Sequence, residues 1–148
     1  MKGLVARQSI VIQAPPARVW KALTDPALIK EYLFGTQVSS DWKAGSQIRY
    51  RGVWEGKSYE DKGIVLKAEP RKVLESTYWS SMSGLPDVPE NYKLVRYELT
   101  PEQGGTRLTV TQDNNATEAE RDHSERNWKM VLEGLKDLVE KMEKLKGE

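Results

Sequence analysis

The chain has 148 residues, the length of one ordinary domain that buries roughly 70% of the surface of its unfolded form. Its 23 basic and 22 acidic residues are mixed and leave a net charge of +1, so no field of one sign attracts nucleic acid or an anionic membrane. Cysteine is absent and no apolar run approaches the roughly 20 residues of a membrane span, which excludes disulfides and thiolate chemistry and argues against a spanning helix. We expect one soluble, cytoplasmic domain over residues 1–148.

The first predicted elements are one strand and two short helices. β-Branched residues at the centre of residues 4–13 predict the strand. Pro15 or Pro16 then stands where the first turn of a helix tolerates proline. Asp25 and Pro26 repeat this device, with a capping side chain followed by proline at the first helical position. The sequence therefore predicts a pair of helices directly after the first strand.

The middle of the chain alternates between apolar and polar side chains with the period of two that is typical of β-strands. The predicted strands are residues 47–54, 59–68, 73–79, 93–99 and 107–112. Short turns and half-polar strands predict an antiparallel sheet with one wet face and one covered face. The connection at residues 80–91 is longer than a hairpin needs, which is typical of a lid, a binding segment or a mobile surface loop.

Residues 117–144 are predicted to form one long amphipathic helix. Thr117 and Glu120 make a capping box at its start. Its apolar stripe consists of Trp128, Val131, Leu132, Leu135, Leu138, Val139, Met142 and Leu145. This stripe is short for a coiled-coil seam, so we expect it to pack against the sheet. Gly134 lowers the helix propensity of this segment. Close approach of a strand or a ligand would explain why a glycine stands there.

These elements, in this order, resemble one superfamily over residues 9–144. The motif elements are residues 15–25, residues 63–70, the strand that ends at Trp79, residues 111–113 and residues 128–136. The pattern resembles the START-like helix-grip fold, also called SRPBCC, and is most similar to the branch named after the activator of the heat shock protein 90 ATPase. The resemblance implies an α+β fold. A curved antiparallel sheet of about seven strands grips the C-terminal helix, with two short helices after the first strand and a cavity between sheet and helix.

The resemblance also implies a class of function, because members of the superfamily bind lipids, sterols, polyketides or plant hormones, and a few catalyse cyclisation. We therefore expect the chain to bind a small, largely apolar molecule of the lipid, polyketide or flavonoid class, without a cofactor. Two alternatives stay open: a co-chaperone-like module that binds another protein, and an enzyme of the cyclase or dehydratase kind. The sequence leaves the oligomeric state open.

Eight side chains are candidates for contact with that ligand. They are Tyr32, Tyr50, Trp54, Trp79, Met82, Tyr97, Asn127 and Trp128. Tyr50 and Trp54 share one face of their predicted strand, where Gly52 leaves room for a ligand. Many chains of the family have glycine at the position of Asn127, so its side chain should narrow the mouth of the cavity or add a polar contact. Trp42 is expected in a loop outside the cavity.

The sequence offers no candidate for catalysis or metal binding. His123 is the only histidine, and it is expected on the solvated surface of the long helix. One histidine without cysteine makes a transition-metal site improbable. No nucleophile elbow or phosphate-binding glycine loop is present. The polar run Arg51, Glu55, Glu60 and Asp61 is expected to be a solvated turn.

Overall fold

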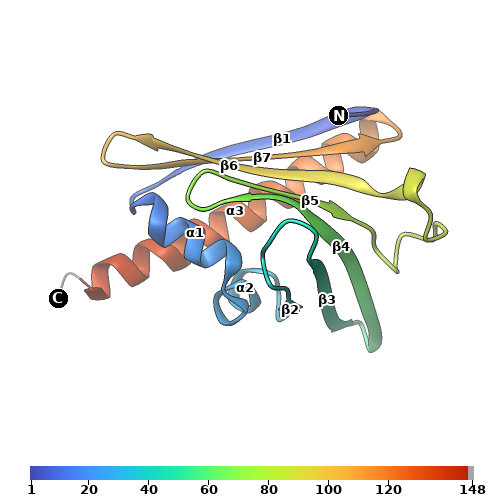
Figure 1. Cartoon of the computed structure of the whole chain (residues 1–148), viewed down its shortest axis with the longest axis horizontal. Coiled ribbons are helices and arrows are strands. Elements are labelled where there is room, and N and C mark those ends of the chain that lie inside the picture. Colours follow the sequence, from blue (N-terminus) through green and yellow to red (C-terminus); the bar gives the residue numbers. More distant parts are fainter. Residues whose placement is uncertain (147–148) are drawn as a thin grey trace.

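The computed structural model describes residues 1–146 and confirms the predicted α+β helix-grip fold (Figure 1). Its elements are β1 (Leu4–Ile12), α1 (Pro16–Thr24), α2 (Pro26–Tyr32), β2 (Gln37–Ser39), β3 (Gln47–Trp54), β4 (Lys57–Glu69), β5 (Val73–Tyr78), η1 (Pro89–Asn91), β6 (Lys93–Glu102), β7 (Gly105–Asn115) and α3 (Glu118–Lys146). None of the helices in residues 1–146 combines the length and the apolarity that crossing a membrane requires.

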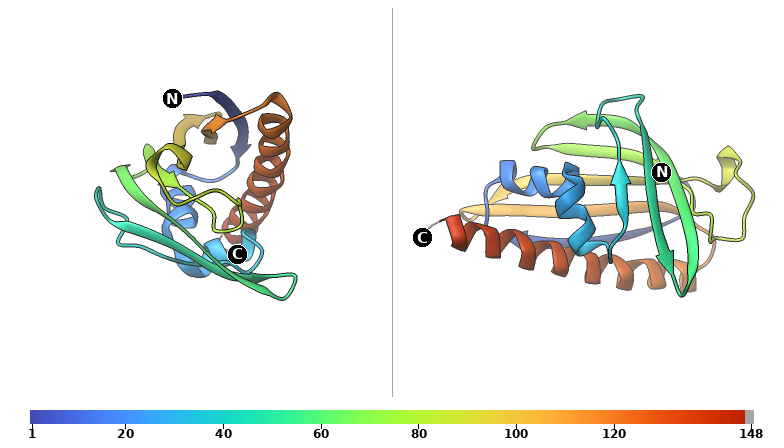
Figure 2. Two further views of the ribbon diagram at one scale, coloured as in Figure 1. Left: turned by 90° about the vertical axis from the view of Figure 1, so that its right-hand side faces the viewer. Right: turned by 90° about the horizontal axis from the view of Figure 1, so that it is seen from below.

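The seven strands form one antiparallel sheet in the order β1-β7-β6-β5-β4-β3-β2. Six of them were predicted individually; β2 was not, because its three residues are too few to show a period. The pairing of β4 with β5 is irregular between Val65 and Lys67. A bulge of this kind bends a strand and increases its twist. Figure 2 shows the resulting sheet curling around one side of α3.

The two short helices follow the predicted capping pattern. Pro16 is the first residue of α1 and Pro26 the first residue of α2. Asp25 lies between the helices, where its backbone N–H donates to the carbonyl of Lys21 and its carboxylate accepts from the N–H of Ala27 at 2.9 Å. One residue thus ends α1 and begins α2, which fixes the sharp turn between them.

Helix α3 lies along β1 and supplies side chains to the backbone of that edge strand. The bonds run from Arg7 N–H to Glu125 at 3.0 Å, from Gln13 N–H to Glu140 at 2.8 Å and from Lys136 Nζ to the carbonyl of Val11 at 2.8 Å. An edge strand normally presents unpaired backbone groups that another chain can pair with. Here α3 occupies several of those groups, so the sheet is closed on this side.

The apolar stripe of α3 packs onto the concave face of the sheet in its central part. Val131, Leu132, Leu135 and Val139 are buried, whereas Leu145 is 63% exposed. The prediction that the stripe continues to Leu145 is therefore wrong. The last turns of α3 are held instead by an ion pair between Glu143 and Arg18 of α1, at 2.9 Å.

The core of the fold can be tested with two leucine variants of the same helix. Leu135→Ala should lower the free energy of unfolding by about 2–5 kcal/mol, because it leaves a cavity at a fully buried position. Leu145→Ala should change it by less than about 0.5 kcal/mol, because the side chain is largely exposed. Denaturant unfolding of both variants measures the difference. Equal losses for the two would contradict the placement of the stripe.

Candidate functional site

A small cavity, which we call the inner chamber, lies between the concave face of the sheet and the helices. Its volume is about 70 Å³. Its walls include Tyr32, Trp42, Tyr50, Leu74, Tyr97 and Trp128. Since a water molecule takes up about 30 Å³ of the liquid, the chamber has room for only a few atoms. It cannot contain a whole sterol or polyketide.

The polar groups of the inner chamber fall into two kinds. The Tyr32 hydroxyl donates to the carbonyl of Ala22, and the Trp128 indole N–H donates to Gln112, both at 2.7 Å. The hydroxyls of Ser76, Tyr50 and Tyr97, in contrast, form no hydrogen bond with another group of residues 1–146. These three hydroxyls are therefore available to a bound molecule.

A larger hollow, which we call the mouth, lies beside the inner chamber and is open to solvent. Its volume is about 580 Å³, within the range of roughly 300–1,000 Å³ that small-molecule pockets have. Its walls include Phe34, Trp54, Tyr59, Asp61, Tyr78 and Met82. Tyr50 and Leu33 line both hollows, so the two adjoin each other. A ligand of ordinary size has to place most of its atoms in the mouth.

The rim of the mouth is apolar and exposed. Phe34 follows α2, Val53 and Trp54 end β3, and Met82 belongs to the loop after β5. Each of these side chains is more than half exposed, with Trp54 at 55%. Three separate segments thus present apolar surface around one opening.

Asp61 is the carboxylate in the wall of the mouth and is only 7% exposed. The Tyr78 hydroxyl donates to one carboxylate oxygen at 2.6 Å. The other oxygen accepts from the backbone N–H of Ser81 at 3.0 Å and, more weakly, from its hydroxyl at 3.4 Å. Within residues 1–146, no lysine or arginine forms an ion pair with Asp61.

Burial raises the pKa of four tyrosines in the two hollows well above the usual range, because desolvation disfavours the phenolate. This applies to Tyr32 and Tyr97 in the inner chamber, and to Tyr50 and Tyr78 next to Asp61. For Tyr50 and Tyr78 the negative charge of Asp61 is the second cause of the raised pKa. These hydroxyls are therefore neutral hydrogen-bonding groups at physiological pH.

Seven of the eight candidate residues line one of the two hollows. Tyr32, Tyr97 and Trp128 line the inner chamber, Trp54, Met82 and Asn127 line the mouth, and Tyr50 lines both. The eighth, Trp79, lies on the outer face of the sheet. It stacks on Tyr92 with ring centroids 6.5 Å apart, and its indole N–H donates to the carbonyl of Leu85 at 3.3 Å. Its neighbour Tyr78 faces inward, so strand alternation turns Trp79 outward.

Three further expectations about the cavity are wrong. Trp42 lines the inner chamber and packs against the core, although it precedes β3 in a loop. The space above Gly52 is filled by the ring of Tyr59, whose hydroxyl lies 2.4 Å from where a Cβ at Gly52 would be. Asp61 is buried, not part of a solvated turn. The alternation of β4 places Asp61 on the same face as Tyr59 and could have indicated this.

The first turns of α3 form the remaining side of the mouth. His123 and Asn127 both line it, and their side chains are hydrogen-bonded at 3.2 Å. Asn127 thus stands at the mouth, hydrogen-bonded to His123. His123 is exposed, as expected, yet faces the same opening. In the described part of the chain, no group of three or more acidic, histidine or cysteine side chains is arranged to hold a metal ion.

Gly134 is approached by a helix, not by a strand. The nearest atom to a Cβ built there is the Cβ of Tyr32 in α2, at 3.6 Å. This is ordinary van der Waals contact, so the glycine lies where α2 packs against α3. The expectation of a strand at this position is wrong.

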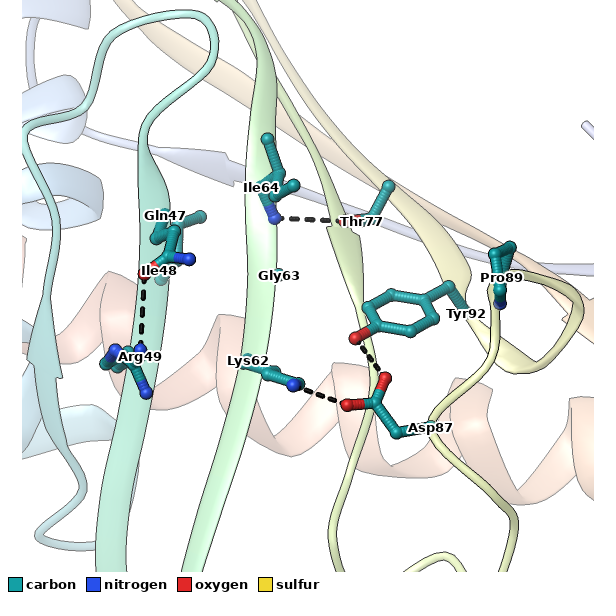
Figure 3. A pocket seen from close by; sticks show the side chains of 10 residues that line it. All are labelled: Gln47, Ile48, Arg49, Lys62, Gly63, Ile64, Thr77, Asp87, Pro89 and Tyr92. Carbon is teal, nitrogen blue, oxygen red and sulfur yellow. Dashed lines mark hydrogen bonds and ion pairs between the residues drawn. The ribbon is translucent and has the colours of Figure 1, made fainter.

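A second groove lies on the outer face of the sheet (Figure 3). Its volume is about 450 Å³, and Ile64, Pro89 and Tyr92 are among its walls. Its polar groups are already paired with one another: Asp87 binds both Lys62 and the hydroxyl of Tyr92. The mouth differs in having a buried carboxylate without a cation, and we therefore take the mouth and the inner chamber as the candidate site.

Comparison with known proteins agrees with this architecture. Residues 13–140 match the family model described as Activator of Hsp90 ATPase homolog 1-like protein. The chain belongs to this family. No curated protein gives a significant match. The resemblance to the START-like superfamily, inferred from the sequence, is thereby confirmed.

Solved structures of other chains are similar to this family member over nearly its whole length. The solution structure of ChR145 from Cytophaga hutchinsonii has 50% identity and a TM-score of 0.84, covering 96% of this chain and 98% of that one. The Aha1 dimer from Colwellia psychrerythraea has 21% identity and a TM-score of 0.71, covering 93% and 96%. DynU16, from the dynemicin biosynthetic locus, has 23% identity and a TM-score of 0.75, covering 92% of this chain and 47% of that one. The last two show the fold alone.

The buried tyrosines predict how this family member responds to alkali. A tyrosine whose pKa is raised by folding contributes stability that is complete below its unfolded pKa of about 10 and is lost as the pH rises above it. We expect the free energy of unfolding to fall above about pH 10, by about 1.4 kcal/mol per pH unit for each such tyrosine. Tyr50→Phe should reduce the slope of this fall by the contribution of one tyrosine, about 1.4 kcal/mol per pH unit.

Ultraviolet absorbance of tyrosinate, recorded together with circular dichroism, measures this response. Absorbance from the buried tyrosines should appear only as the protein unfolds. Smooth ionisation of all six tyrosines near pH 10, with the fold intact, would contradict the burial described above.

Proposed function

We propose that this chain binds a small, largely apolar molecule, with most of the ligand in the mouth and one end in the inner chamber. The observation that carries the proposal is that the two hollows adjoin, with Tyr50 and Leu33 in the wall of both. Proteins of the START-like superfamily generally bind hydrophobic ligands or mediate interactions. The ligand classes we propose are lipids, polyketides and flavonoids.

Burial of the ligand provides most of the binding free energy. Each methylene group removed from water contributes roughly 0.8 kcal/mol. The exposed rim side chains, Phe34, Trp54 and Met82, offer apolar surface to a ligand. The unpartnered hydroxyls of Tyr50 and Tyr97 supply the few polar contacts that fix orientation in such pockets. The small size of the inner chamber selects a ligand with one narrow end.

A protein-interaction module is the second candidate, and one observation favours it. Ile64 and Leu66 on the outer face of β4 are more than 40% exposed, beside the groove that Pro89 and Tyr92 line. Exposed apolar surface of this kind marks some interaction sites. The flanking side chains Lys67 and Glu69 are paired across the surface at 3.3 Å, which keeps the apolar area small. We therefore place small-molecule binding first.

A panel of fatty acids, sterols, polyketides and flavonoids tests the proposal, with tryptophan fluorescence and melting temperature as readouts. A fitting molecule should raise the melting temperature by mass action and change the fluorescence saturably. Trp54→Ala should weaken binding by about tenfold, because it removes an aromatic wall of the mouth. Native mass spectrometry of freshly purified protein detects a molecule already bound.

Trp79→Ala is the matched control, since Trp79 lies on the outer face against Tyr92. It should leave the affinity unchanged. If Trp79→Ala weakened binding and Trp54→Ala did not, the ligand would lie in the outer-face groove. If no member of the panel gave a saturable change, the interaction module would replace the small-molecule function.

A further inference from the structure

The charge of the mouth is set by one residue. Asp61 is 7% exposed, and its carboxylate accepts from Tyr78 and Ser81 only. A carboxylate has about four lone-pair positions. The Tyr78 hydroxyl and the backbone N–H and hydroxyl of Ser81 occupy at most three of them. Removing a carboxylate from water is unfavourable unless a positive charge or enough donors compensate it. The protein provides donors but, within residues 1–146, no ion pair.

The other side chains of the mouth reinforce this asymmetry. Among the described residues that line it, none is lysine or arginine. On the opposite face of β3 and β4, Arg49 and Arg51 pair with Glu60, and Lys62 pairs with Asp87. Lys57 shares the face of Asp61 but lies at the far end of β4, opposite Trp54, and does not line the mouth. His123 is the one histidine among these lining side chains.

Aromatic rings surround the same space. The mouth is lined by Phe34, Tyr50, Trp54, Tyr59 and Tyr78. The rings of Tyr50 and Tyr78 meet edge to face with centroids 5.4 Å apart, and Tyr78 bonds directly to Asp61. The negative faces of aromatic rings attract cations, most strongly where water is excluded.

We propose that the ligand of this site carries a positively charged nitrogen, as an amine or quaternary ammonium group, that lies in the mouth against Asp61 and the aromatic rings. This inference rests on the proposed function and narrows its ligand class. The cationic group supplies the charge that the protein leaves out, and the apolar part of the molecule extends toward Tyr97 in the inner chamber. A ligand with a carboxylate in the same place is repelled by Asp61.

Three probes with the same phenylbutyl part test the inference: 4-phenylbutyltrimethylammonium, 4-phenylbutanol and 5-phenylpentanoate. Binding is measured by calorimetry at about pH 8, where imidazoles are mostly neutral. The ammonium probe should bind at least about tenfold more tightly than the alcohol, and the carboxylate probe should bind most weakly. This comparison uses the unaltered protein and does not depend on any variant folding.

Variants then show which side chains cause the preference for the ammonium probe. Asp61→Asn should remove the preference for the ammonium probe over phenylbutanol. Asp87→Asn is the matched control, because that carboxylate lies on the outer face beside Lys62, and it should have no effect. Trp54→Leu, at an exposed position that tolerates substitution, should weaken the ammonium probe more than the alcohol, because it removes a ring but keeps apolar volume.

The outcomes separate this inference from the proposed function. If phenylbutanol binds as tightly as the ammonium probe, the cationic ligand is excluded while apolar binding stands. The same holds if the ammonium preference survives Asp61→Asn. If none of the three probes binds, and the wider panel of apolar molecules also fails, the proposed function and this inference are both overturned.

Discussion

The packing of α3 across the concave face of the sheet is the constraint on which the rest of the structure depends. In the middle of the helix, Leu132 and Leu135 fill the space between helix and sheet, and Lys136 reaches the free edge of β1. Toward the start of α3 the packing opens, so that Trp128 borders the inner chamber and Asn127 the mouth. The candidate site therefore lies at the N-terminal end of α3, where no buried apolar side chain fills the space between helix and sheet. The position at which the buried stripe of α3 begins limits the size of the two hollows.

Asp61 has two structural consequences that cannot be separated. Through Ser81 it holds the start of the loop after β5, and that loop places Met82 at the rim of the mouth. Through its charge it gives the mouth a negative potential that the surrounding rings do not neutralise. A buried carboxylate with no ion partner is unfavourable for folding in itself. Its presence in the wall of a hollow, close to Tyr78, is more readily understood as part of a site than as a support for the fold.

The sequence predicted the fold well because the fold depends on local patterns. Proline and aspartate mark the helix pair, the period of two marks the strands, and the stripe marks α3. The site was harder to predict because it depends on which face a residue takes at an irregular position. Trp79 follows an inward tyrosine at the end of β5, and Trp42 lies in a loop whose path no period describes. Asp61 was assigned to a turn because its charged neighbours hid the alternation of β4.

The two hollows differ in polarity, and this difference gives the site a direction. The inner chamber is enclosed by aromatic and aliphatic side chains, with the neutral hydroxyls of Ser76, Tyr50 and Tyr97 among its unpartnered polar groups. The mouth contains Asp61 and opens to water. An amphipathic molecule therefore gains most when its narrow apolar end enters first and its polar group stops beside Asp61, because the reverse orientation would take the polar group out of water and leave the carboxylate without a partner. In the proposed site, the fold provides the space and the placement of one carboxylate sets the favoured orientation of the ligand.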